Sequence, residues 1–469
     1  MYITSAACLH TPVNGAMSDS EKLPTIESLQ CIDSAPESKH ILSCDRRKTG
    51  VAFGQEMPNE QASHQKLQTH LSEAPDGGMR AWLAVFAAAL VTFSTFGFST
   101  SWGVFQAYYE ENLLLHTPPS TIAWIGSTQY ALAYLPSLAT GRLFDLGYFK
   151  IPFFAASCVL VACTFLIAEC TQFWQLFLTQ GVGLGMSCGF LFSPAIVSVS
   201  QWFSKRRGLA LSTTALGAAL GSIVFPVAAQ KLIPLIGFRW TVRVFGLIMM
   251  ATMGTANIFL KRRLPPVNVR GGLFNLKAFH NKAYFTYCVS GIIILLGLYT
   301  ELTYISVSAV AIGVSKDFSF YMIAIANAAS TFGRVISGLL ADKIGALNTM
   351  AVFTAMTGIT TIAWPFAKDK SQLITIAAIH GFSIGAYISL YSVPAVAMGK
   401  MEDAGRRVGM FMSLIGLGGI AGPPISGAIR TATGGFVDAG FYSGGCIIFG
   451  VALLLVARCL HLRRLWGKF

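Results

Sequence analysis

The chain has 469 residues, of which 54% are hydrophobic and 12% are charged, and its formal net charge is +13. A soluble domain carries about 25% charged residues, so the composition indicates a membrane protein. The basic residues gather in every second connection between apolar runs, as the positive-inside rule requires, and this accounts for the net charge without a nucleic-acid partner.

Residues 1–74 are polar and show no sustained apolar period. Such a composition cannot bury enough surface to fold, so we predict a disordered cytosolic tail. The stretch also lacks the apolar core of a signal peptide, and we expect the first membrane span to direct insertion. The distribution of basic residues places both termini in the cytosol.

Apolar runs follow one another from residue 81 onward, and each is about 20 residues long, enough to cross roughly 30 Å of hydrocarbon as a helix. They do not alternate as the strands of a membrane β-barrel do. The sequence therefore predicts an all-α membrane protein with about twelve transmembrane helices. The expected spans are 81–106, 121–143, 150–169, 173–200, 208–230, 240–260, 283–311, 318–341, 347–366, 372–398, 408–429 and 436–458.

The longest connection between spans, residues 261–282, divides them six against six. We expect it to be a cytosolic linker between an N-terminal half, 75–260, and a C-terminal half, 283–459. A short cytosolic tail is expected at 460–469. The ten cysteines include no Cys-x-x-Cys pair, so we expect neither a disulfide framework nor a metal site.

The two halves share three sequence features at nearly one offset. "QGVGLGMSCGFLFSP" (180–194) matches "HGFSIGAYISLYSVP" (380–394), and "GRLFDLG" (141–147) matches "GLLADKIG" (338–345). The arginine pair before span five likewise matches the pair before span eleven. Two six-helix halves related by an axis along the membrane normal are the arrangement of the major facilitator fold, which we predict here.

The repeated Gly-x-Leu-x-Asp turn is expected at the cytosolic ends of spans two and eight. Gly141 and Gly338 let another helix approach closely. Asp145 and Asp342 can accept hydrogen bonds from a neighbouring helix N-terminus or pair with basic residues. We interpret these contacts as a gate that forms when the cytosolic side closes; the alternative is a pair of ordinary turns with solvated aspartates. Four arginines are assigned to the same gate: Arg206, Arg207, Arg406 and Arg407.

Two motifs carry a family resemblance over residues 75–458. "PDGGMRAWLAVFAAAL" (75–90) contains an Asp-Gly-Gly and then a tryptophan, and "WFSKRRGLALSTTALGAALG" (202–221) combines an aromatic residue, basic residues and spaced glycines. Together they resemble the monocarboxylate porter family of the major facilitator superfamily. "GFRWTVRVFG" (237–246) and "GPPISGAI" (422–429) are similar to its fungal branch in particular. The residues of the first motif are Asp76, Gly77, Gly78 and Trp82.

The resemblance implies that spans one, four, seven and ten line a central cavity. In the animal lactate carriers, a lysine in span one and an Asp/Arg pair in span eight are tied to proton-coupled carboxylate transport. Here the lysine position falls near Thr100 and the aspartate position on Ser330, and only Arg334 is kept. That route to proton coupling is therefore incomplete.

Arg334 is expected about 12 Å inside its span, where an arginine costs about 2.5–3.5 kcal/mol on insertion scales. We expect it to bind the anionic group of a substrate, because a guanidinium holds a carboxylate by two parallel hydrogen bonds. Glu301 could pair with Arg334 only if their depths match. Glu301 and His380 are also substrate-binding candidates, with a solvated, snorkelling glutamate and a packing histidine as the alternatives. Three further candidates, which could instead bond helix backbones, are Thr100, Tyr304 and Tyr387.

These features predict a secondary active transporter that moves a small organic, carboxylate-bearing metabolite by alternating access, with no cofactor and no catalytic activity. Uptake and efflux of a fungal secondary metabolite both fit, and a coupling proton is left open. The alternative function is a transporter-like nutrient sensor, which would need a long ordered cytosolic module. We expect the plasma membrane, with the vacuolar membrane as the alternative.

Overall fold

The computed structural model describes residues 74–266, 272–464 and 467, all of which belong to one compact unit, Ala62–Phe469. The predicted cytosolic tail, residues 1–74, lies outside the described residues except for its last position, and so does the middle of the expected linker. Every regular element in the described part is a helix. This confirms the predicted all-α fold.

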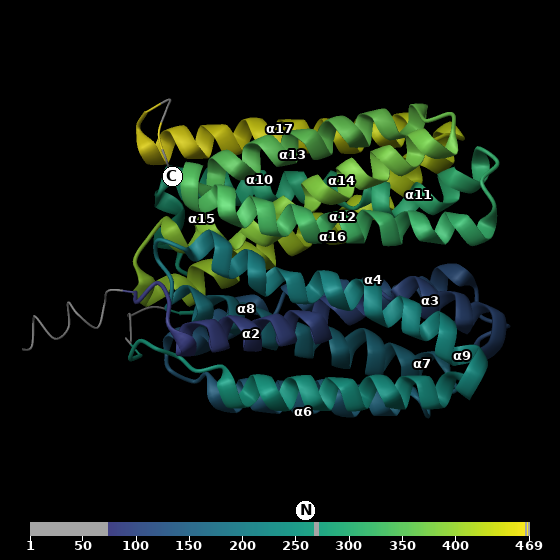
Figure 1. Ribbon diagram of the computed structural model, residues 1–469, viewed down its shortest axis with the longest axis horizontal. Helices are drawn as coiled ribbons and strands as arrows, with labels where there is room; N and C mark the ends of the chain where they lie inside the picture. The colour runs from purple at the N-terminus through teal and green to yellow at the C-terminus, as the bar shows by residue number, and fades with distance from the viewer. Residues whose placement is uncertain (1–73, 267–271, 465–466, 468–469) are drawn as a thin grey trace, which may run out of the picture. The chain divides into compact units, whose positions relative to one another are not determined.

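The first bundle is drawn in purple to teal in Figure 1. Pro136 divides its second span into two helices, because proline lacks the N–H group that a helix interior requires. The elements are α2 (Met79–Thr92), η1 (Phe93–Gly97), α3 (Trp102–Tyr108), η2 (Tyr109–Leu113), α4 (Pro119–Tyr134), α5 (Ser137–Asp145), α6 (Lys150–Ile167), α7 (Phe173–Leu176), η3 (Phe177–Leu184), α8 (Gly185–Ser200) and α9 (Arg207–Phe259), of which η1, η2 and η3 are π-helical.

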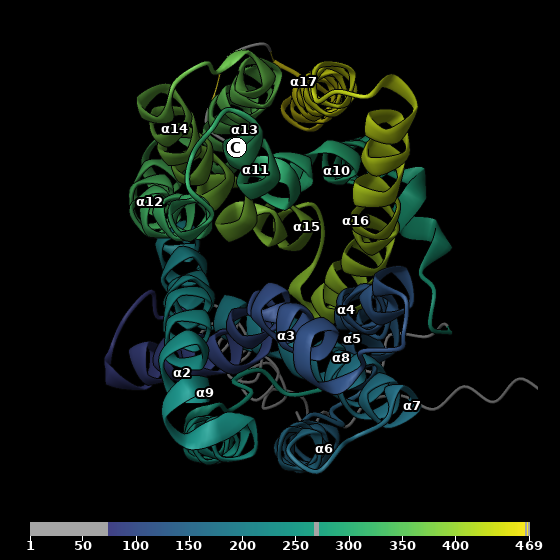
Figure 2. The ribbon, with the colours of Figure 1, turned by 90° about the vertical axis from the view of Figure 1, so that its right-hand side faces the viewer.

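The second bundle, drawn in green to yellow, lies beside the first in both views (Figure 1 and Figure 2). Its elements are η4 (Leu276–His280), α10 (Lys282–Leu298), α11 (Thr300–Ala311), α12 (Lys316–Ile344), α13 (Ala346–Ala363), η5 (Trp364–Phe366), α14 (Lys370–Leu390), α15 (Ser392–Ala397), η6 (Met401–Asp403), α16 (Ala404–Thr433) and α17 (Val437–Leu462).

Ten stretches of the described residues are long and apolar enough to cross a membrane. One of them, α9, contains two expected spans, because the chain leaves helical geometry at Gly237, where φ is +80°. Glycine adopts this conformation without the steric cost of a side chain. The second expected span is covered by α4 and α5 together. When α9 is counted as two spans and α4 with α5 as one more, the ten stretches account for all twelve predicted spans.

The main contacts between the two bundles lie in two places. α9 packs against α12, and α16 packs against α4 and α5, as the end-on view shows (Figure 2). In the predicted numbering these are spans five and eight, and spans two and eleven. Spans two and five of the first half correspond to spans eight and eleven of the second half in the sequence repeat. The contact of span five with span eight is therefore the counterpart of the contact of span eleven with span two. We call the end of the bundles where α5 and α12 finish and α9 and α16 begin the capped end.

Candidate functional site

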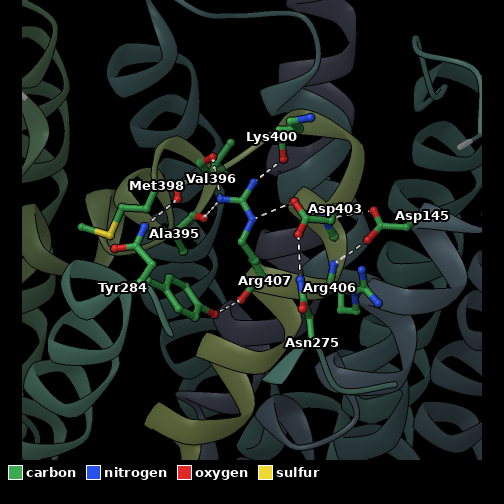
Figure 3. A network of polar contacts seen from close by, with 12 residues as sticks. Asp145, Asn275, Tyr284, Ala395, Val396, Met398, Lys400, Asp403, Arg406 and Arg407 are labelled. Carbon is green, nitrogen blue, oxygen red and sulfur yellow. Dashed lines mark hydrogen bonds and ion pairs between the residues drawn. The ribbon is translucent and has the colours of Figure 1, made fainter. Parts of the chain in front are cut away.

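Asp145, the last residue of α5, caps the first turn of α16 in the other bundle. Its Oδ1 accepts a hydrogen bond from the backbone N–H of Gly405 at 3.0 Å, and its Oδ2 accepts one from that of Arg406 at 2.8 Å (Figure 3). The first N–H groups of a helix have no partner within the helix and carry a partial positive charge, so a carboxylate stabilises them. Asp145 is only 2% exposed, which excludes the solvated turn that was its alternative.

Asp342, near the end of α12, makes the equivalent contact in the opposite direction. Its Oδ1 accepts a hydrogen bond from the backbone N–H of Gly208 at 2.8 Å, and its Oδ2 accepts one from that of Leu209 at 3.0 Å. Both donors lie in the first turn of α9. Each half of the protein thus caps a helix of the other half.

Small residues allow the helices to come this close. A Cβ atom added to Gly141 would overlap the carbonyl group of Gly405, and one added to Gly338 would lie 2.6 Å from the Cβ of Ser212. Contacts under 3.0 Å force the backbone or its neighbour to shift. A side chain at either glycine would therefore separate the two halves at the capped end.

Arg407 stabilises the second half from within. Its Nε atom forms an ion pair with Asp403 Oδ1 at 2.9 Å, and its Nη1 atom donates hydrogen bonds to the carbonyl groups of Ala395, at 3.1 Å, and Val396, at 3.3 Å (Figure 3). Asp403 also accepts a hydrogen bond from Asn275 at 3.0 Å. These contacts fix the connection between α15 and α16, and with it the start of the helix that Asp145 caps.

The other arginines assigned to the gate contribute mainly through backbone groups. Arg406 offers its N–H to Asp145, and Arg206 offers its N–H to Asp76. The Nε atom of Arg207 donates a hydrogen bond to the carbonyl oxygen of Phe203 at 3.0 Å, one turn earlier in the chain. Of the two kinds of partner predicted for the aspartates, a helix N-terminus or a basic side chain, these contacts use the helix start that the arginines accompany.

Asp76 of the first family motif caps the segment that leads into α9. Its Oδ1 accepts hydrogen bonds from the backbone N–H groups of Ser204, Lys205 and Arg206 at 2.6, 2.7 and 3.2 Å. This segment belongs to the second family motif. The two motifs that carry the resemblance therefore form one contact, and it fixes the start of the helix that Asp342 caps.

The rest of the first motif supports the same contact. The Trp82 ring packs edge-on against the Phe203 ring with the centroids 5.3 Å apart. Gly78 has φ +90°, a value that favours glycine, and a Cβ atom added to Gly77 would have no other atom within 4 Å. Sequence reasoning treated the two motifs separately and missed this contact. An aspartate beside a Gly-Gly turn was the signal that could have indicated a cap.

Arg334 lies on α12 at the interface between the halves, where it is 7% exposed. Its Nη1 atom donates a hydrogen bond to the carbonyl oxygen of Ala215 on α9, and its Nε atom has no hydrogen-bond partner among the described residues. None of the ion pairs found in the described part of the chain includes Arg334. Three tyrosines lie close enough to interact with its charge: Tyr134, Tyr299 and Tyr391.

Glu301 and His380 form a pair of their own. The Oε2 atom of Glu301 lies 2.7 Å from the Nδ1 atom of His380, and both side chains are 0% exposed. The carboxylate is therefore not solvated, and its partner is His380 and not Arg334. The structure brings together two candidates that the sequence had considered separately.

The remaining candidates divide between two surroundings. The Thr100 hydroxyl donates to a carbonyl one turn earlier at 2.7 Å, and the Tyr304 hydroxyl donates to the carbonyl of Pro423 at 3.3 Å, which are the backbone contacts named as their alternative. Tyr387 is buried with its ring 6.1 Å from that of Tyr391, which is one of the tyrosines near Arg334. Tyr134 was missed because span two was not expected to line the cavity.

Comparison with known proteins agrees with this fold. The family model described as Major Facilitator Superfamily matches residues 85–393. The human organic anion transporter MFSD10 has a similar fold: its TM-score is 0.64 at 16% sequence identity, with 81% of this chain and 100% of that chain covered.

Curated fungal proteins are similar over most of the chain. The aspyridones efflux protein apdF of Emericella nidulans is 34% identical over 82% of this chain and 79% of its own length. The MFS transporter asaE of Aspergillus flavus is 31% identical over 82% and 88%, and the agnestins efflux protein AgnL12 of Paecilomyces divaricatus is 29% identical over 88% and 97%. The chain therefore belongs to the Major Facilitator Superfamily and is a membrane transporter.

Proposed function

We propose that this transporter exports a small organic anion, a fungal secondary metabolite, by alternating access, and that Arg334 holds the anionic group. The observation that carries the proposal is the environment of Arg334, a buried guanidinium at the interface of the halves with an unpartnered Nε. A guanidinium in such a site favours a carboxylate, which it can hold by two parallel hydrogen bonds. The motifs that resemble those of the monocarboxylate porters support a carboxylate-bearing substrate.

The contact between Arg334 and Ala215 links substrate binding to the movement of the halves. The guanidinium on α12 donates to a backbone carbonyl on α9, and these two helices belong to different halves. A substrate carboxylate would compete with that carbonyl for the same donor. Binding would therefore release one contact across the interface and favour opening, as differential affinity for two states requires.

The direction of transport is inferred from the relatives. Two of them are named as efflux proteins, for aspyridones and for agnestins. Efflux implies the plasma membrane, with the capped end in the cytosol, as the basic connections between spans indicate. A proton gradient is the driving force that we propose.

Vesicle transport tests the proposal. Inside-out plasma-membrane vesicles from yeast that express the full chain would be given labelled aspyridones or agnestins, with vesicles from cells that carry an empty vector as the control. We expect accumulation that benzoate inhibits and that benzyl alcohol, which has the ring without the charge, does not. Equal inhibition by the two compounds would contradict an anion site. Binding without accumulation would favour the sensor function.

A further inference from the structure

Glu301 and His380 meet deep within the second half. Glu301 lies in the first turn of α11 and His380 in the middle of α14, each about ten residues, or roughly 15 Å, from the end of its helix opposite the capped end. Both side chains are 0% exposed, and Oε2 and Nδ1 are 2.7 Å apart. The hydroxyl of Thr360, on α13, lies 3.2 Å from the same Nδ1 atom. Three helices therefore contribute to one buried ionisable cluster.

The cluster is only partly satisfied. The Nε2 atom of His380 and both carboxylate oxygens of Glu301 are buried and have no hydrogen-bond partner among the described residues, although Oε2 lies 2.7 Å from Nδ1. Buried polar atoms in proteins are otherwise paired in the large majority of cases. A buried ion pair is also a weak source of stability, since apolar residues of similar volume often serve as well. A purely structural role does not explain the unpartnered atoms.

We propose that Glu301 and His380 form the proton-binding site through which this carrier couples transport to a proton gradient. Histidine changes its charge near neutral pH. With a neutral imidazole and an ionised carboxylate, the pair has a net charge of −1. A proton taken from water by the unpartnered Nε2 atom gives an imidazolium, and the net charge of the pair becomes zero.

This charge change makes protonation depend on conformation. A net charge within a dry membrane interior is costly, so the buried arrangement favours the protonated, uncharged pair. When α11 and α14 open to water, hydration stabilises the charged pair and the proton can leave. Because such linkage is reciprocal, protonation in turn favours the buried arrangement. The proton thus enters the site from one side of the membrane and is released on the other.

Several charged groups on the neighbouring helices have contacts of their own. On α16, Arg430 packs over the rings of Tyr304 and Phe436, and on α12, Arg334 donates to Ala215. Lys370 begins α14, and its Nζ lies 3.4 Å from the centroid of a phenylalanine ring. Tyr387 lies two turns from His380 on α14 itself. The helices packed against α11 and α14 carry further charged or titratable groups, among them Arg207, Lys231, Arg239, Arg243, Tyr321, Asp342, Lys343, Arg406, Arg407, Asp438, Tyr442, Arg458 and His461.

Direct observation of the His380 ring tests the site without a substrate. The full chain, labelled with ¹⁵N-histidine and reconstituted in liposomes, would be studied by solid-state NMR from about pH 5 to about pH 8. His380 is one of eight histidines, and its signals are identified by their loss in His380→Gln. We expect Nε2 to change between its protonated and unprotonated shifts, and Glu301→Gln to keep the ring neutral over more of the range. A ring that holds one protonation state throughout would overturn the proposal.

The coupling itself rests on the transport function proposed above, and it is tested with aspyridones in proteoliposomes. Accumulation driven by a pH gradient would be compared with exchange in the absence of a gradient. We expect Glu301→Gln and His380→Gln to lose gradient-driven accumulation, so that its ratio to exchange falls. In Glu169→Gln, which alters the exposed pair with Arg243, the ratio should match that of the wild type.

The outcomes separate the two proposals. If the wild type moves no aspyridones while His380 titrates as expected, the proton site stands and the proposed substrate fails. If both variants lose accumulation and exchange in equal measure, together with thermal stability, the pair is a structural clamp and the coupling proposal is wrong.

Discussion

Asp342 binds the backbone of Gly208 so closely that a side chain could not be added at that position. The Oδ1 atom accepts the Gly208 N–H at 2.8 Å, and a Cβ atom on Gly208 would lie 2.7 Å from the same oxygen. Gly405 has the same relation to Asp145, where the corresponding Cβ atom would lie 2.5 Å from Oδ1. The glycine that opens each capped helix therefore gives the carboxylate room to reach the first turn. The two caps make the same chemical contact twice, once in each direction across the interface.

Removal of the charge should loosen the capped end. Asp145→Asn and Asp342→Asn keep the size of the side chain but lose the attraction to the helix N-terminus, which we expect to cost about 1 kcal/mol at each site. The closed population relative to the open one should then fall by about fivefold for each variant. Turnover in the vesicle assay should fall in both variants. In the double variant the two free-energy costs should add, because the sites are well separated.

Asp438→Asn provides the control for these variants, because Asp438 lies in the first turn of its own helix, α17. Its turnover should match that of the wild type. Normal turnover in both Asp145→Asn and Asp342→Asn, at normal surface expression, would show that the caps do not act as a gate.

A methyl group at the glycines should prevent closure. Gly141→Ala places a Cβ atom against the carbonyl group of Gly405, so we expect the capped end to stay open and transport to be lost. The control is Gly254→Ala, in a helical position with nothing within 4 Å of its Cβ. Alanine there should be neutral or stabilise the helix by about 0.5–1 kcal/mol. Closure is measured by the alkylation of a cysteine introduced between α5 and α16, which the closed end protects from the reagent. Equal protection of this cysteine in Gly141→Ala and Gly254→Ala would disprove the steric argument.

The fold was largely predictable from the sequence. A membrane span needs only a local length and composition, so the apolar runs predicted the helices. The repeated Gly-x-Leu-x-Asp turn predicted a matched pair of contacts, because a helix N-terminus is a ready partner for a carboxylate. The π-helical segment at Phe93–Gly97 was not predicted, since it depends on how the helices pack, whereas the break at Gly237 falls between the expected spans 208–230 and 240–260.

The candidate site was less predictable. Arg334 was identified from its depth in the span alone. Its hydrogen-bond acceptor, the backbone carbonyl of Ala215, could not be predicted, because every residue has a backbone carbonyl. Glu301 and His380 were each recognised as costly groups within a span. Their contact depends on the rotation and depth of α11 relative to α14, which the sequence of neither helix determines. Local chemistry was therefore predictable where tertiary pairing was not.

The cap at Asp76 should matter for stability more than for transport. Asp76→Ala removes the acceptor of three backbone N–H groups, and we expect a loss of about 1–2 kcal/mol. The residue has φ 51°, a conformation that asparagine tolerates better than alanine, so Asp76→Asn should lose less. Thermal unfolding of the purified full chain in detergent measures both. An unchanged melting temperature for Asp76→Ala would mean that the contact between the two motifs contributes nothing.

Arg334 should control affinity through the shape of its side chain as well as through its charge. Arg334→Lys keeps the positive charge but loses the fork of parallel donors, and a hydrogen bond to a charged group is worth about 1.5–3 kcal/mol, so the apparent affinity should fall by about tenfold or more. Arg334→Ala should abolish transport while the protein still folds and reaches the membrane, because the arginine has no ion-pair partner among the described residues that would be left unpaired. Arg243→Lys, which alters the exposed ion pair with Glu169, should change neither the apparent affinity nor the transport rate. Concentration-dependent uptake of aspyridones into the vesicles measures the affinities. Normal transport by Arg334→Ala, or a failure caused only by loss of the protein from the membrane, would show that Arg334 does not bind the substrate.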